Sequence, residues 1–141
     1  LETSIARNPS FAAGHAVLAQ VLQLSGRADE ALTRMRDASR LDGRSFVAGL
    51  ATLLFARGDY PQALVAAEQA VDAAPRYAFA RVIATACAWW SGEHARAIGH
   101  AEALRELSPT FTIGRFLQTF GAGNDAVVRV SEALRAVGAP R

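Results

Sequence analysis

One short pattern occurs three times in this chain, and its spacing constrains the fold more than any other feature. Each copy is a glycine followed five residues later by an alanine, and the pairs are Gly26 with Ala31, Gly58 with Ala63, and Gly92 with Ala97. The glycines lie 32 and then 34 residues apart. Unlike residues that recur together at such a period predict an array of stacked supersecondary units, each packed on its neighbours.

The residue types suit a helical hairpin. A glycine can adopt the left-handed conformation in which a chain leaves one helix and reverses, whereas a residue with a side chain is strained there. An alanine five residues later lets two helices cross closely. A proline cannot continue a helix but can start one, and Pro75 and Pro109 follow the second and third copies. Each unit therefore reads as helix, turn, helix and break.

This pattern resembles the tetratricopeptide-repeat family. The resemblance extends well from Leu1 to about Pro109 and loosely over the remainder. It implies an all-α fold, a right-handed superhelix of antiparallel hairpins in which only neighbouring hairpins touch. Where the family prefers tryptophan, the chain departs from the pattern and has His15, Val47 and Arg81. The resemblance therefore assigns a fold and no named subfamily.

The period divides residues 1–141 into one repeat domain. We expect the tail of a preceding repeat, three repeats and a degenerate capping hairpin, over residues 1–9, 10–43, 44–75, 76–109 and 110–141. The expected helices cover residues 1–7, 10–24, 28–41, 44–56, 60–73, 76–90, 94–107, 110–120 and 125–137. Because Leu1 falls in mid-helix on this reading, we expect a longer parent polypeptide.

Composition narrows the class of protein. Half of the residues are hydrophobic (51%) and 20% are charged, which indicates a folded chain. The mean hydropathy of +0.13 is high for a soluble domain and predicts apolar surface that another element covers. All 15 basic residues are arginine, which indicates a GC-rich, bacterial genome. No apolar run reaches the ~18 residues of a membrane span.

Charge and cysteine content limit the partners and the compartment. The net charge is only +2, and acidic and basic residues alternate, so we do not expect nucleic-acid binding. Cys87 is the single cysteine, which excludes an internal disulfide and favours a reducing, cytoplasmic location.

Residues that could carry chemistry lack the context that chemistry needs. No pair among His15, His94 and His100 has metal-binding spacing, and apolar neighbours should leave Cys87 inert. Gly121, Gly123 and Ala126 match a dinucleotide fingerprint by letters, but a helical pattern precedes them where a strand is required. The carboxylates with helical spacing read as solubilising faces; they are Glu68, Asp72, Glu102 and Glu106. We expect no enzyme, cofactor, metal or small-molecule substrate.

Trp89 and Trp90 are adjacent, and neighbours on a helix point about 100° apart. Both cannot enter one seam, so we expect one to pack between hairpins and the other to line the concave surface or face a partner. The alternative is two core tryptophans.

The family resemblance implies that the first helix of each hairpin lines an inner groove. Helical spacing then assigns this groove to Ala13, Ala16, Gln20, Gln23, Ser45, Ala48, Thr52, Phe55, Phe79, Val82, Ala86 and Trp89. These residues are small, polar or aromatic, so a free carboxylate would find no charge to pair with. They suit an apolar or helical segment, which a partner, a second copy or the chain's own elements could supply.

Two functions fit these observations. The first is an interaction or scaffold module that binds an apolar or helical protein segment or self-associates. The second is a C-terminal regulatory domain whose effector lies upstream, because residues 132–140 look like the close of repeat regions in bacterial adenylate cyclases and winged-helix regulators.

The repeat phase makes a testable prediction. Ala63→Trp and Ala31→Trp should each destabilise the fold by about 1–3 kcal/mol, because overpacking a close helix crossing forces the helices apart. Gln62→Trp, one position away and solvent-facing in this phase, should be nearly neutral. Thermal unfolding measures all three variants, and equal shifts for the two classes would mean that the phase is wrong.

Overall fold

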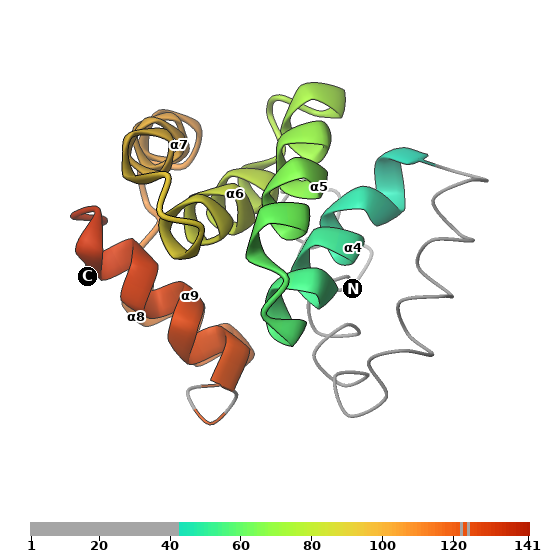
Figure 1. Cartoon of the computed structure of the whole chain (residues 1–141). Coiled ribbons are helices and arrows are strands. Elements are labelled where there is room, and N and C mark those ends of the chain that lie inside the picture. Colours follow the sequence, from blue (N-terminus) through green and yellow to red (C-terminus); the bar gives the residue numbers. More distant parts are fainter. Residues whose placement is uncertain (1–42, 122, 124) are drawn as a thin grey trace.

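The computed structural model describes residues 43–121, 123 and 125–141, and this part of the chain is all-α (Figure 1). Its helices are α4 (Gly43–Arg57), α5 (Tyr60–Ala73), α6 (Ala78–Trp90), α7 (His94–Leu107), α8 (Ile113–Phe120) and α9 (Asp125–Ala136). No strand occurs within the described ranges, which confirms the predicted fold class. The predicted positions that lie outside these ranges are Ala13, Ala16, Gln20, Gln23, Gly26 and Ala31.

Most helix bounds lie close to those expected, and two helices start later. α5 and α7 occupy the predicted ranges, whereas α6 starts at Ala78 and α8 at Ile113. The later start of α8 has a clear cause, because the side chain of Thr112 accepts a hydrogen bond from the backbone N–H of Arg115 at 3.1 Å. Such a cap satisfies one of the free donors at the beginning of a helix and fixes where it begins.

Two hairpins have the geometry that the glycine–alanine pattern requires. α4 packs against α5 and α6 against α7, and α5 packs against α6. Gly58 and Gly92 adopt φ values of 86° and 80°, in the left-handed region where a side chain would be strained. Ala63 and Ala97 are fully buried, whereas Gln62 is exposed. The turn and the crossing thus follow directly from these residue types.

α6 is the central helix of the described part. It contacts α4, α5, α7 and α9, and ten of its thirteen residues are buried. A helix that is apolar on every side must be enclosed. Alanine supplies five of the ten buried residues, at Ala78, Ala80, Ala84, Ala86 and Ala88, so that four helices can approach one axis. No described helix is long and apolar enough to span a membrane.

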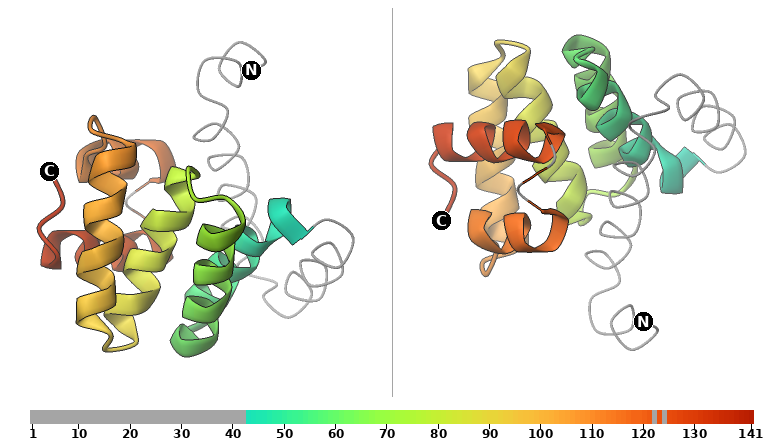
Figure 2. Two further views of the ribbon diagram at one scale, coloured as in Figure 1. Left: turned by 90° about the horizontal axis from the view of Figure 1, so that it is seen from above. Right: turned by 90° about the horizontal axis from the view of Figure 1, so that it is seen from below.

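The last pair of helices does not stack as the earlier hairpins do. α9 contacts α6 and reaches α4, so it touches a hairpin that is not its neighbour. Its axis runs across that of α6 in the right-hand view of Figure 2. The expectation that only neighbouring hairpins touch is therefore wrong at α9. The physical reason is that α8 has only eight residues, whereas the broad apolar face of α9 needs more cover than α8 offers.

The end of α9 also closes back on α8. Gly138 has a φ of 82°, and the backbone N–H of Ala139 donates to the carbonyl of Leu134 at 2.9 Å, which ends the helix. The backbone N–H of Ile113 then donates to the carbonyl of Pro140 at 2.8 Å. The chain after α9 is thus fastened to the start of α8.

The two kinds of glycine in this part of the chain should respond oppositely to alanine. Gly92→Ala should destabilise the protein by about 1 kcal/mol, because its left-handed φ strains any residue with a side chain. Gly99, exposed in α7 with open space around its Cα, is the matched control. Gly99→Ala should stabilise by roughly 0.5–1 kcal/mol. Urea unfolding measures both changes, and a destabilising Gly99→Ala would contradict the helical packing described.

Candidate functional site

Most of the predicted groove residues on α4 and α6 are buried, whereas Trp89 is partly exposed. Six of them, three on α4 and three on α6, are each at most 5% exposed; they are Ala48, Thr52, Phe55, Phe79, Val82 and Ala86. These residues therefore do not line an open groove. This corrects the expectation of an accessible groove at these positions.

The two phenylalanines of this predicted face contact the α8–α9 pair. Phe79 on α6 meets Phe120 of α8 edge to face, with ring centroids 5.5 Å apart. Phe55 on α4 lies under the guanidinium of Arg129 on α9, whose central carbon is 5.0 Å from the ring centroid. The last two helices thus cover Phe79 and Phe55, two residues that the sequence analysis assigns to a ligand-binding groove.

The two adjacent tryptophans go in different directions. Trp89 lies on the ring of His94 at 4.1 Å, at the start of α7. Trp90 faces α9, and its indole N–H donates to the backbone carbonyl of Arg129 at 2.9 Å. Both are partly buried. Trp90, which the sequence analysis did not place in the groove, is therefore the tryptophan that contacts the covering helix.

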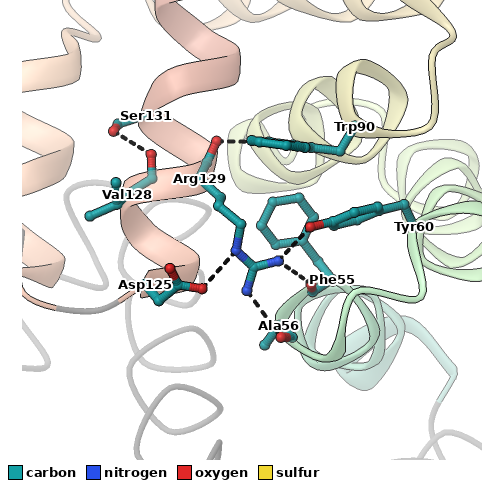
Figure 3. A network of polar contacts seen from close by, with 8 residues as sticks. All are labelled: Phe55, Ala56, Tyr60, Trp90, Asp125, Val128, Arg129 and Ser131. Atoms are coloured by element: carbon teal, nitrogen blue, oxygen red, sulfur yellow. Dashed lines mark hydrogen bonds and ion pairs between the residues drawn. The ribbon is translucent and has the colours of Figure 1, made fainter.

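Arg129 is the centre of the contact between α9 and the rest of the protein (Figure 3). Its Nη1 donates to the carbonyl of Phe55 at 3.0 Å and to the hydroxyl of Tyr60 at 2.8 Å. Its Nη2 donates to the carbonyl of Ala56 at 3.0 Å, and its Nε to Asp125 at 2.9 Å. The side chain is 16% exposed. All three nitrogens of the guanidinium therefore have a partner.

The surroundings of Arg129 favour a positive charge. The carbonyls of Phe55 and Ala56 belong to the last turn of α4, at the negative end of the helix dipole. The rings of Phe55 and Tyr60 lie within 6 Å of the guanidinium carbon, at 5.0 and 5.9 Å, which is the range of a cation–π contact. The end of α4 and the two aromatic rings therefore both attract the guanidinium of Arg129.

The aromatic residues around Arg129 also support one another. The rings of Tyr60 and Trp90 stack at 5.7 Å, and those of Phe55 and Tyr60 pack at 5.4 Å. Tyr60 belongs to α5, Trp90 to α6 and Phe55 to α4. We call Phe55, Ala56, Tyr60 and Trp90 the arginine seat. Sequence reasoning missed it, and the only local signal was the spacing of Asp125 and Arg129, which suits an ion pair on one helix.

A second polar cluster joins α5, α6 and α7. Nη1 of Arg81 lies 3.0 Å from Nδ1 of His100, and Nε2 of His100 lies 3.0 Å from Glu68. Arginine can only donate, so Nδ1 accepts and Nε2 carries the proton that it gives to Glu68. Glu68 also pairs with Arg96 at 3.4 Å. Glu68 is therefore an interhelical partner as well as a surface carboxylate, whereas Asp72, Glu102 and Glu106 are exposed.

The other positions weighed for chemistry offer no reactive site in the described ranges. Cys87 is fully buried, and burial raises the pKa of its thiol, which keeps it protonated. The described residues hold no group of three or more histidine, cysteine or acidic side chains that could bind a metal. Gly121 follows α8 and Asp125 begins α9, so the fingerprint-like letters lie between two helices.

A cavity of about 160 Å³ lies away from the arginine seat, between α7 and the end of the chain. Its apolar lining includes Ile98, Leu104, Phe111, Val137, Ala139 and Pro140. Ile98 is 47% exposed and stands among these residues. This cavity is therefore not on the predicted groove face.

Comparison with known proteins supports the fold. No protein-family model and no curated protein matches the sequence. A solved structure of the type III secretion translocator chaperone SycD from Yersinia enterocolitica, described as an alternative dimer, has a similar fold, with a TM-score of 0.62. The two sequences are 22% identical over 86% of this chain and 92% of that one. The likeness shows that this chain has a helical-repeat fold of the tetratricopeptide kind.

The arginine seat predicts which substitutions on α9 matter. Arg129→Ala should destabilise the protein by about 2 kcal/mol, because hydrogen bonds to a charged group are lost and acceptors are left unpaired. Arg129→Lys should be nearly as harmful, since an ammonium cannot reach acceptors arranged for a planar fork. Arg135→Ala, exposed on the same helix, is the control and should be almost neutral. Thermal unfolding distinguishes them, and a harmless Arg129→Lys would contradict the geometry.

Proposed function

We propose that this chain is a protein-interaction module whose receptor surface is the face of α4 and α6 that α9 covers. The observation that carries the proposal is the position of α9, which passes its neighbouring hairpin and reaches α4. A helix seated in this way acts as an internal ligand. The surface beneath it is suited to hold a helix, whether from this chain or from another.

The contacts of α9 describe what this surface recognises. Its buried residues recur at the spacing of one helix face, and they are Ala126, Val127, Val130, Ser131, Ala133 and Leu134. Beneath them lie the small and aromatic residues of α4 and α6. This is the helix-in-groove mode, in which an amphipathic helix places its apolar side into a hydrophobic surface. A second copy of the chain could supply such a helix as well as an unrelated protein.

The likeness to SycD supports a protein partner, because that protein is named a translocator chaperone and its structure is described as a dimer. The regulatory-domain alternative has no comparable support among the described residues. Binding of protein segments by a helical array requires no catalytic group, and we propose no enzymatic activity for this chain.

A peptide titration tests the proposal. A fluorescent peptide with the sequence of residues 125–136 should bind the full chain, and binding should strengthen when the chain's own α9 is weakened. Leu134→Ala in the chain serves this purpose, because Leu134 is fully buried and its truncation costs about 2–5 kcal/mol. Because the hairpins α4–α5 and α6–α7 also pack on each other, we expect local release of α9 and not global unfolding. Fluorescence anisotropy reports binding, and circular dichroism verifies the remaining helices.

Two controls locate the binding surface. A peptide of the same composition in scrambled order should bind no variant. Ile98→Ser, on the cavity beside α7, should leave binding unchanged. Equal binding of the ordered and scrambled peptides would refute the proposal, and loss of binding in Ile98→Ser would move the surface to that cavity. Should Leu134→Ala unfold the chain, the milder Val130→Ala takes its place.

A further inference from the structure

We infer that the arginine seat is a guanidinium-recognition site and that a partner helix on this face carries an arginine where α9 has Arg129. The inference rests on the proposed function and adds to it the identity of the key side chain. It depends on the chemistry of the seat, on the fact that the seat belongs to the receptor, and on the position of the seat relative to the apolar face.

The acceptors are arranged for a planar fork. One carbonyl and one hydroxyl receive the two protons of Nη1, and a second carbonyl receives a proton of Nη2. A lysine presents its donors from a single nitrogen and cannot satisfy acceptors spread along the edge of a guanidinium. The rings of Phe55 and Tyr60 add an attraction that a neutral side chain would not feel. The seat therefore selects arginine by both shape and charge.

The seat does not depend on α9 for its own structure. Its residues come from α4, α5 and α6, and the mutual packing of Phe55, Tyr60 and Trp90 holds the rings in place. The carbonyls of Phe55 and Ala56 are fixed by the helix that contains them. A site arranged before its ligand arrives loses less conformational freedom on binding. An arriving arginine would meet a preformed site.

The position of the seat sets a sequence pattern for the partner. Relative to Arg129, the apolar residues of α9 lie two positions before it (Val127), one after it (Val130) and five after it (Leu134). The indole N–H of Trp90 donates to a backbone carbonyl. This contact therefore fixes how deeply the helix lies without selecting for any side chain. Asp125 is 84% exposed, so we do not require an acidic residue four positions before the arginine.

A partner must compete with α9, which is tethered and therefore present at high effective concentration. The apparent Kd of the partner is its intrinsic Kd divided by the fraction of molecules in which α9 does not occupy the face. The face would thus stay closed to weak helices and open only to one that supplies both the apolar residues and the arginine.

The test compares three peptides on the Leu134→Ala chain. One has the sequence of residues 125–136, and the others carry lysine or citrulline in place of Arg129. Citrulline keeps the planar shape and removes the charge. We expect the arginine peptide to bind at least roughly tenfold more tightly than either, because hydrogen bonds to charged groups of this kind are worth that factor. Helix propensity does not confuse the arginine–lysine comparison, since the two residues are nearly equal.

A substitution in the arginine seat complements the comparison of peptides. Tyr60→Phe keeps the ring and removes the hydroxyl that accepts from Nη1, so it should reduce the preference for the arginine peptide. Equal binding of the three peptides would overturn the inference and leave the proposed function standing. Binding of none above the scrambled control would refute both.

Discussion

The contact between Arg129 and the last turn of α4 holds together parts of the chain that are more than 70 residues apart. The end of a helix leaves carbonyls without partners inside that helix, and these need donors from elsewhere. Here the guanidinium of Arg129 donates to the carbonyl of Ala56 and, beside the backbone N–H of Gly58, to that of Phe55, while it lies over the ring of Phe55. This contact places Arg129 of α9 over the ring of Phe55 at the end of α4, beside Trp90 of α6.

The central position of α6 follows from its small residues. Four helices contact α6, which is possible because alanines at half of its buried positions allow close approach. A larger residue at these positions would separate the hairpins, since closely packed cores tolerate little added volume. The same smallness leaves α6 with few large side chains of its own. Phe79 and Trp90 therefore form its specific contacts with the covering pair, through Phe120 and Arg129.

The repeat pattern was enough to predict the fold but not the site. Glycine and alanine at fixed spacing act locally, so the turns at Gly58 and Gly92 and the bounds of α5 and α7 could be derived from residue types. The apolar stripe of α9 predicts that one face of this helix is buried, but it does not predict which helix covers that face. The choice between Trp89 and Trp90 turns on a 100° rotation, which periodicity alone does not settle. Glu68 gained its role only when folding brought Arg81 and His100 together.

Hydrogen exchange of the indole N–H of Trp90 is the most direct test of the central claim, that α9 lies on the face of α4 and α6. The indole N–H donates to the carbonyl of Arg129, so it exists as a protected group only while α9 is seated. Nuclear magnetic resonance of the labelled chain, with Trp89→Phe to assign the signal, measures its exchange with deuterated solvent. The account predicts slow exchange in the wild type and fast exchange in Leu134→Ala, with the backbone amides of α6 protected in both. Fast indole exchange in the wild type beside a protected α6 would contradict it.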